Sequence, residues 1–548
     1  VNLLVCTSLW DPYMDIPKFS SYSHLQASAS QSPDAFVAKQ RTNTAQANQG
    51  VQLTLSQTAS LSELYQPKPT YVQHSVSNTT QNSEQTQRFT HQLNNENSDN
   101  RFKGLGTRFN ELLDKPNEPY QQVLRRYSYQ SDSASAGKVD FSAFEVSSKT
   151  KTQAFNLALK TKSGATIQFS IESFNGHGKN PDTLVYEFED FSVHKVGQGA
   201  SFRSTEISFE VEGDLTKAEI KQLKEFSENL EAFSNALFND ANPSLKALDL
   251  ASFDVISELS LNSMGGTSKP LTLEYENSDE ERFIEVNYDG NKAQIDLTKL
   301  GQRVYSEQSK EQVMEHYLGI LRDSAEKAQA DDIQALLMLD VFAAGFDMSD
   351  SEVARAKELE QDRATELAGH DAFDAEKSKD ALLPIPDFSF HFISHKERFN
   401  IAEKPEEYSG FSLELSVHTK QETEGPTTST TQQQDFKLEG AYYEALGLLE
   451  EPDFATQTYR YNEFKYDVSN TVTTATGNQQ LLSASLEKTN DNFDSKKAYY
   501  KGELIEDKKE ESGPEARLLD FTERLGLEAE LTQKQILEDV LIDPFEDQ

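Results

Sequence analysis

The chain has 548 residues, 36% of them hydrophobic, and a formal net charge of −39. This length exceeds what one ordinary core organises, and the low apolar fraction predicts that part of the chain forms no core. Such an acidic surface repels phosphate backbones and anionic membranes, and no run approaches the ~18 apolar residues of a membrane span. We therefore expect neither nucleic-acid binding nor membrane insertion. The charge chiefly serves solubility, and a basic partner or surface-bound cations are the alternatives.

The single cysteine, Cys6, excludes an intrachain disulfide, a cysteine-based zinc site and an iron–sulfur cluster. The apolar run at Val1–Trp10 lacks a basic region and a small-residue cleavage site, so it is a poor signal peptide. Met14 is an alternative start. The compartment stays open between cytoplasmic and exported without a recognisable signal peptide.

Residues 1–100 are dominated by Ser, Thr, Gln and Asn and lack apolar periodicity, which predicts a disordered polar arm. Residues 101–137 predict a helical segment and linker. Phe102, Leu105 and Phe109 have helical spacing, and a second short helical stretch is expected around Tyr120–Tyr127.

Residues 138–264 predict a β-meander followed by a helix. Apolar residues alternate with polar ones in several short runs, and Ser163-Gly164 marks a hairpin turn. Thr216 and Glu219 have the spacing of a capping box at the start of the helix. Its apolar stripe is expected to pack on the sheet and consists of Leu223, Phe226, Leu230, Phe233 and Leu237.

Residues 265–380 predict a β-hairpin, with a turn at Asp289-Gly290, followed by helices. Residues 381–548 predict a β-rich segment with C-terminal helices, including Leu518–Leu525 and a helix capped by Thr532 and Gln535. The expected fold class is therefore α+β: antiparallel β-hairpins or meanders, each followed by amphipathic helices, behind the disordered N-terminal arm.

Three groups of residues are candidates for chemistry, and each has a simpler interpretation. His391 and His395 resemble a metal pair, but four residues along a strand span roughly 13 Å, which is too far to share an ion. The segment Gly176–Lys179 is the most site-like loop, although a plain hairpin loop explains it. An acidic group could hold calcium but is better explained as a solvated sheet face; it consists of Glu187, Glu189, Asp190, Glu206, Glu210 and Glu212.

The sequence carries no recognised catalytic, phosphate-binding or metal motif. We therefore assign no catalytic, cofactor-binding or metal residues and expect no cofactor. Paired carboxylates for glycoside hydrolysis cannot be singled out among 91 acidic residues.

The stretch Ile207–Leu223, in which a strand ends in V-x-G-D-L before a capped acidic helix, resembles a type of uncharacterised proteobacterial protein. The resemblance covers about residues 150–262 and implies a fold unit but no activity. The function expected from all these features is non-enzymatic binding or scaffolding of an unknown protein partner, at the bacterial envelope or outside the cell. The alternatives are a hydrolase with a dispersed carboxylate site and a cation-dependent surface protein.

Overall fold

The computed structural model describes most of one compact unit, Leu64–Gln548; a second unit, Val1–Glu63, lies outside the described residues. The described ranges are 70–78, 87–89, 102–130, 151–178, 185–187, 192–194, 200–238, 244–264, 269–278, 281–298, 307–347, 382–383, 385–400, 402–447, 451–477, 480–520, 522–525 and 530–545.

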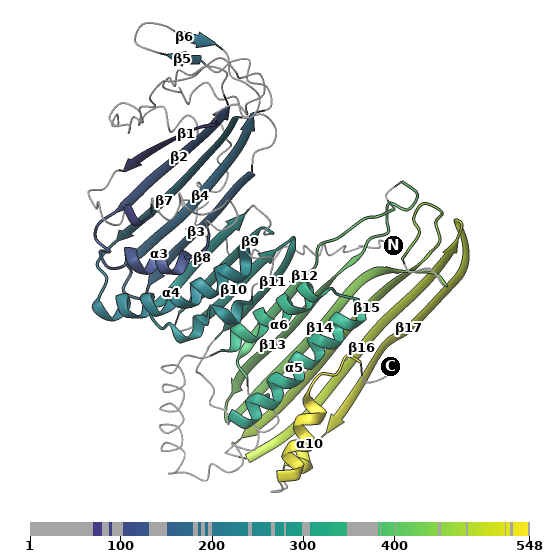
Figure 1. Cartoon of the computed structure of the whole chain (residues 1–548). Helices are drawn as coiled ribbons and strands as arrows, with labels where there is room; N and C mark the ends of the chain where they lie inside the picture. The colour runs from purple at the N-terminus through teal and green to yellow at the C-terminus, as the bar shows by residue number, and fades with distance from the viewer. Residues whose placement is uncertain are drawn as a thin grey trace, which may run out of the picture. The chain divides into compact units, whose positions relative to one another are not determined.

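Within these ranges, 15 strands form one antiparallel sheet in the order β1-β2-β7-β4-β3-β8 and then β9 to β17 in sequence (Figure 1). The strands are β1 (Thr70–Asn78), β2 (Tyr120–Gln130), β3 (Lys151–Thr161), β4 (Thr166–Gly178), β7 (Ala200–Glu212), β8 (Ile256–Met264), β9 (Leu271–Asn277), β10 (Glu281–Tyr288), β11 (Asn291–Thr298), β12 (Asp387–Ile393), β13 (Gly410–Glu424), β14 (Thr427–Glu444), β15 (Tyr459–Gly477), β16 (Gln480–Tyr500) and β17 (Glu503–Asp520). A separate pair consists of β5 (Val185–Glu187) and β6 (Ser192–His194).

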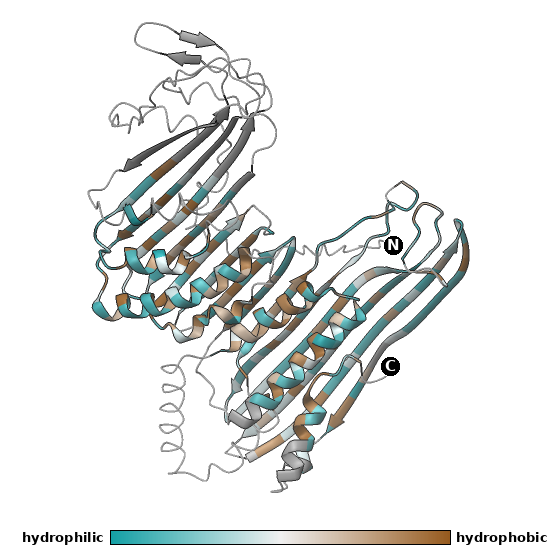
Figure 2. Cartoon of the chain, viewed as in Figure 1, coloured by the Kyte–Doolittle hydropathy of each residue, from teal (hydrophilic) through white to brown (hydrophobic). Residues whose placement is uncertain are grey.

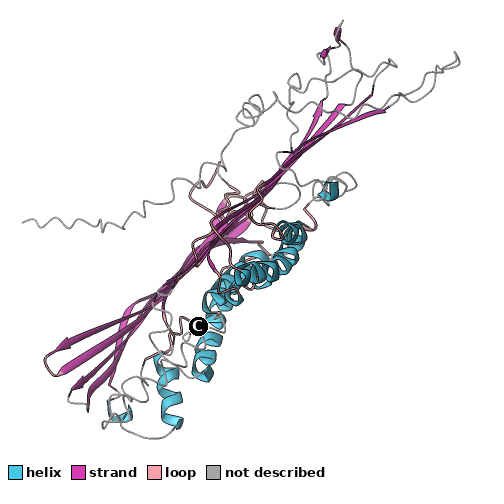
Figure 3. Cartoon of the chain, turned by 90° about the vertical axis from the view of Figure 1, so that its left-hand side faces the viewer, coloured by secondary structure: helices cyan, strands magenta, loops and turns pink. Residues whose placement is uncertain are grey.

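The described helices lie against one face of this sheet (Figure 3). We call the opposite face, on which none of the described helices lies, the uncovered face. The described helices are α3 (Leu105–Leu112), α4 (Lys217–Phe238), α5 (Glu307–Lys327), α6 (Asp332–Phe346), α9 (Thr522–Leu525) and α10 (Glu530–Val540), with short 3₁₀ turns η3 (Leu245–Ala247) and η4 (Leu250–Ser252). Apolar residues alternate with polar ones along the strands under the helices (Figure 2). The apolar positions join the helical stripes in one continuous core.

The start of α4 confirms the predicted capping box. The Thr216 backbone N–H donates to Glu219 Oε2 at 2.8 Å, and the Glu219 N–H donates to Thr216 Oγ1 at 3.2 Å. The predicted apolar stripe of α4 is fully buried in the core. The turn at Asp289-Gly290 is also confirmed, because both residues have positive φ and Tyr288 pairs with Asn291, as a two-residue type I′ hairpin requires.

The predicted α+β arrangement, with helices after each hairpin, is wrong. Among the described residues, helices follow β1, β7, β11 and β17, whereas β12 to β17 follow one another as a meander without an intervening helix. β8 also pairs with β9, and β11 with β12, so one sheet runs through the predicted boundaries at 264/265 and 380/381. Periodicity identified several of the strands but could not show that they share a single sheet.

Several local predictions also change. Residues 120–130 form β2 rather than helix, and residues 503–520 form β17, so Leu518 lies in a strand. α10 begins at Glu530, which places Thr532 and Gln535 inside the helix. The predicted disordered arm lies mostly outside the described residues, but residues 70–78 form β1, and Phe89 is fully buried against Tyr120.

The segment after α10 is fastened to the sheet by two buried amides. Gln434 donates to the Val540 carbonyl at 2.8 Å and accepts from the Ile542 N–H at 3.2 Å. Asn470 donates to the carbonyls of Val540 and Leu541 at 3.0 and 3.1 Å. These bonds satisfy buried polar groups on both sides and fix the C-terminal part of the covering layer.

Candidate functional site

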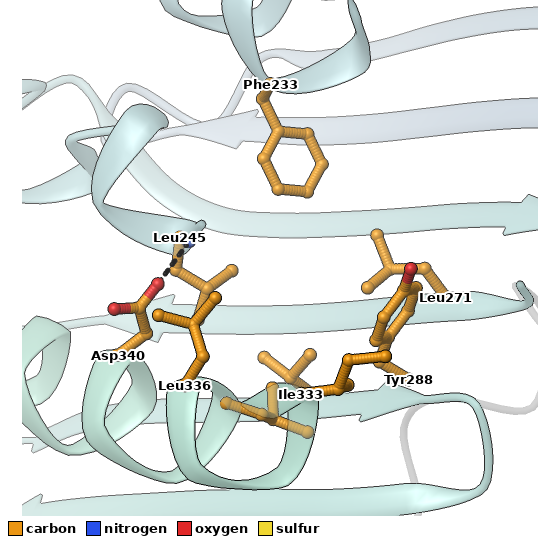
Figure 4. A pocket seen from close by; sticks show the side chains of 9 residues that line it. Phe233, Leu245, Leu271, Tyr288, Ile333, Leu336 and Asp340 are labelled. Atoms are coloured by element: carbon orange, nitrogen blue, oxygen red, sulfur yellow. Dashed lines mark hydrogen bonds between the residues drawn. The ribbon is translucent and has the colours of Figure 1, made fainter. Parts of the chain in front are cut away.

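The hollow between α6, η3 and the sheet, whose lining side chains are drawn in Figure 4, is too small for a ligand. Its volume is about 10 Å³, and its walls are almost entirely apolar. A single water needs ~10–15 Å³. Asp340 at its rim accepts from the Leu245 backbone N–H at 3.2 Å and thereby caps η3. This region is a packing junction rather than a binding site.

Four glutamates on the uncovered face form what we call the acidic block: Glu258 on β8, Glu274 and Glu276 on β9, and Glu285 on β10. The register places Glu258 directly opposite Glu276, and Glu274 directly opposite Glu285. Directly opposite positions bring Cβ atoms to ~4.5–5.5 Å, and like charges there destabilise a sheet. The block therefore concentrates repulsion in the middle of the sheet.

Two carboxyl groups in and beside the acidic block, those of Glu274 and Asp296, have a raised pKa. The pKa of Glu274 is raised by partial desolvation of its carboxyl group and by the charges of Glu285 and Glu276. The pKa of Asp296, on β11, is raised by partial desolvation and by Glu281. Both carboxyl groups hold their protons more tightly than in water, chiefly because desolvation disfavours the charged form, and the neighbouring carboxylates add to the effect.

Nearby side chains offset part of this field. Lys160 forms an ion pair with Glu258 at 2.5 Å, and Lys292 forms one with Glu285 at 2.9 Å. The Ser260 hydroxyl donates to Glu274 Oε1 at 2.8 Å. The two lysines balance two of the four negative charges, so the block with these partners keeps a net formal charge of −2.

A second feature of the uncovered face is a hollow of about 120 Å³ across β12, β13 and β14, which we call the serine trough. Ser389 and Ser416 lie directly opposite each other. Asp435 lies opposite Ser416, and Asp296 lies opposite Ser389. One wall is the row His391–Glu414–Lys437, and His418 lines the other side. Two small residues thus lie between taller charged side chains, with a carboxylate at each end of their row.

The third feature is an aromatic cluster on the uncovered face, at one end of β14, β15 and β16. It comprises Tyr443, Tyr459, Tyr461, Tyr499 and Phe454 and is separate from the main core. The residues of the loop before β13 fasten onto it: Tyr459 donates to Glu407 Oε2 at 2.8 Å, and Asn400 Nδ2 donates to the Tyr459 hydroxyl at 2.9 Å.

Burial raises the pKa of Glu407, although the Tyr459 hydrogen bond opposes this effect. Phe399 stacks on Phe454 with 5.4 Å between ring centroids. The cluster anchors two loops to the sheet, and its buried polar groups serve that anchoring.

The structure separates the two histidines of the predicted metal pair. His391 lies on β12 with its Nδ1 atom 3.9 Å from Glu414 Oε1. His395 follows the strand, and its backbone N–H donates to Asn291 Oδ1 at 2.8 Å. Across the described residues, no three His, Cys, Asp or Glu side chains gather where a metal ion could be held.

The structure also changes the interpretation of the other two candidate sites, the segment Gly176–Lys179 and the acidic group. Gly176, His177 and Gly178 belong to β4 and pair with β7, so they are not a free loop; Lys179 lies outside the described residues. Of the acidic group, Glu206, Glu210 and Glu212 lie on β7, whereas Glu187 lies on β5 in the separate strand pair. Glu189 and Asp190 are outside the described residues. The strands flanking β7 are β2 and β4, and Glu206 lies opposite Glu172.

Neither the acidic block nor the serine trough was predicted from the sequence. A weak signal existed, because Glu274 and Glu276 alternate with Leu273 and Tyr275 in the period of a one-sided strand. Their partners on other strands are fixed by register, which local sequence does not state.

No family model matches the chain, and neither a curated protein nor a solved structure matches it significantly. In the described part of the chain, no helix combines the length and apolar character needed to cross a membrane.

Proposed function

We propose that this is a non-enzymatic binding protein that holds a basic protein partner on the uncovered face of its sheet. One observation carries the proposal: two pairs of glutamates lie directly opposite each other in the acidic block. Lysine or arginine at one position of each pair would turn repulsion into attraction. Keeping glutamate at all four positions costs stability. We infer that a positively charged partner balances these charges when it binds.

Desolvation is the main cause of the raised pKa of Glu274, but the charges of Glu285 and Glu276 add to it, and a nearby cation would offset that contribution. A partner's ammonium or guanidinium group placed between Glu274 and Glu285 would supply that relief. The net charge of −39 adds long-range attraction that would speed the encounter with a basic partner.

The test compares two variants with equal net charge. The block variant carries Glu258→Gln, Glu274→Gln, Glu276→Gln and Glu285→Gln. The edge variant carries Glu503→Gln, Asp507→Asn, Glu510→Gln and Glu511→Gln on β17, where these side chains are exposed. Binding of a fluorescent oligolysine peptide is measured by anisotropy at physiological salt.

We expect the block variant to bind at least about tenfold more weakly, which is ~1.4 kcal/mol, and the edge variant to change less than about threefold. Equal losses would mean that only total charge matters and would contradict the proposal. An additional titration with calcium separates the cation-dependent alternative: a thermal melt raised by calcium and lowered by chelator would favour cations over a protein partner.

A further inference from the structure

The serine trough lies on the same line across the sheet as half of the acidic block. From β8 to β14 the register connects one residue per strand without interruption: Glu258, Glu276, Phe283, Asp296, Ser389, Ser416 and Asp435. Strands are ~4.8 Å apart, so this row spans about 29 Å, the length of about nine extended residues. A partner segment lying across the strands can therefore contact the block and the trough together.

The shape of the trough suits one inserted side-chain head group. Ser389, Ser416 and Asp435 are half-buried and form the floor, whereas Glu414, His418 and Lys437 are exposed and stand around it. The volume of about 120 Å³ is roughly ten times what one water needs. This volume accommodates a guanidinium group and the methylene carbons next to it, but not a larger ligand.

Three polar groups of the trough can accept hydrogen bonds from a planar cation: Glu414, Ser416 and Asp435, of which Asp435 Oδ1 also accepts from Gln433 Nε2 at 2.8 Å. Glu414 and Asp435 are diagonal neighbours across β13 and β14, a separation of ~7–8 Å between Cα atoms, with the Ser416 hydroxyl beside them. Lys437 in the wall forms an ion pair with Asp467 on β15 at 3.7 Å, which draws its charge toward that strand. A guanidinium offers five N–H donors in a fixed plane and can reach both carboxylates and a hydroxyl at once, whereas an ammonium is a point charge.

We propose that the serine trough is the specificity pocket of this face and receives an arginine side chain of the basic partner. This inference rests on the proposed function and adds to it the side chain that is recognised and the direction in which the partner lies. Lysines elsewhere in the segment would face the acidic block, and the arginine would set the position of the segment along the row.

The test uses two basic peptides of equal length and charge, one with a central arginine and one with lysine at that position. The trough variant, Ser389→Val with Ser416→Val, fills the hollow without changing charge, and valine suits a strand. The matched control is Ser170→Val with Ser208→Val, because these serines also lie directly opposite each other on β4 and β7, with hydroxyl oxygens 2.6 Å apart.

We expect the unmodified protein to prefer the arginine peptide by about tenfold, the trough variant to lose that preference, and the control variant to keep it. Lysine-peptide affinity should stay within about twofold throughout. Asp435→Asn is a second variant, should the double valine variant melt early; it should lower arginine-peptide affinity more than lysine-peptide affinity. Equal affinity of the two peptides, or a preference that survives in the trough variant, would overturn the inference. Failure of both peptides to bind would overturn the proposed function itself.

Discussion

Strands β4 and β17 belong to the same sheet but are stabilised differently. On β4, Ile167, Phe169 and Ile171 face the helices and are at most 1% exposed. On β17, Leu518 is 74% exposed, and nearly all of the described side chains are exposed. β4 is also paired on both sides, with β3 and β7, whereas β17 pairs only with β16 and with two register shifts. Because burial and pairing both favour β4, we expect β17 to open locally long before β4 does.

The largest expected effect follows from removing an aromatic side chain from the covered face. Phe226 is fully buried and packs edge-on against Phe253 with 5.4 Å between centroids. Phe226→Ala should lower the free energy of unfolding by about 3–5 kcal/mol, measured by urea denaturation. Leu518→Ala on β17 is the control and should change it by less than ~0.5 kcal/mol. Similar losses of unfolding free energy in the two variants would contradict the conclusion that burial makes the two regions differ in stability.

A smaller effect concerns the junction where β7 passes into α4. Burial acts to raise the pKa of Glu219, but hydrogen bonds from Ser163, from the Thr216 backbone and hydroxyl, and from Thr161 outweigh it and lower the pKa to about 2. Because this value lies below that of the unfolded chain, Glu219 contributes stability that is complete above pH 4.5 and is lost as the pH falls toward 2.

Glu219→Gln should therefore cost about 1–2 kcal/mol at neutral pH and progressively less in acid. The measurement is the free energy of unfolding of both proteins at a series of pH values. A difference that does not shrink below pH 4.5 would show that the charge of Glu219 is not what stabilises the cap.

The smallest effect has the opposite sign and belongs to the uncovered face. Glu274→Gln removes one member of a like-charged pair and keeps an acceptor for Ser260, so it should stabilise the protein by about 0.2–1 kcal/mol at neutral pH. The raised pKa of Glu274 means that the folded state binds this proton more tightly than the unfolded state. The unmodified protein should therefore gain stability as the pH falls and approach the variant. A destabilised variant at neutral pH would contradict net repulsion between Glu274 and its neighbouring carboxylates.

Much of the local structure could be predicted from the sequence, because it depends on neighbours in the chain. The capping box at Thr216 and the turn at Asp289 are of this kind. β2 was missed because Gln122 occupies a core-facing position between Tyr120 and Leu124 and hides the alternation; the Tyr120 hydroxyl donates to its Oε1 atom at 2.6 Å. β17 was missed because its exposed, charged side chains carry no hydrophobic period.

The sheet as a whole could not be predicted, because its order depends on contacts between distant segments. β7 lies between β2 and β4, and residues 131–199 separate β2 from β7 along the chain. Both features of the proposed binding face depend on this register: Ser389 and Ser416, for example, become neighbours only when β12 pairs with β13.

The outer strand β17 also bears on how large an assembly this chain can form. An open antiparallel sheet can in principle lengthen without limit, as a fibril does, by adding strands from further molecules. In β17 the pairing with β16 is interrupted by two register shifts, and Pro514 offers no N–H to an incoming strand. Its middle is charged at Lys508, Lys509, Glu510 and Glu511. Growth at this edge is thereby disfavoured, so a sheet of this breadth can remain a single molecule.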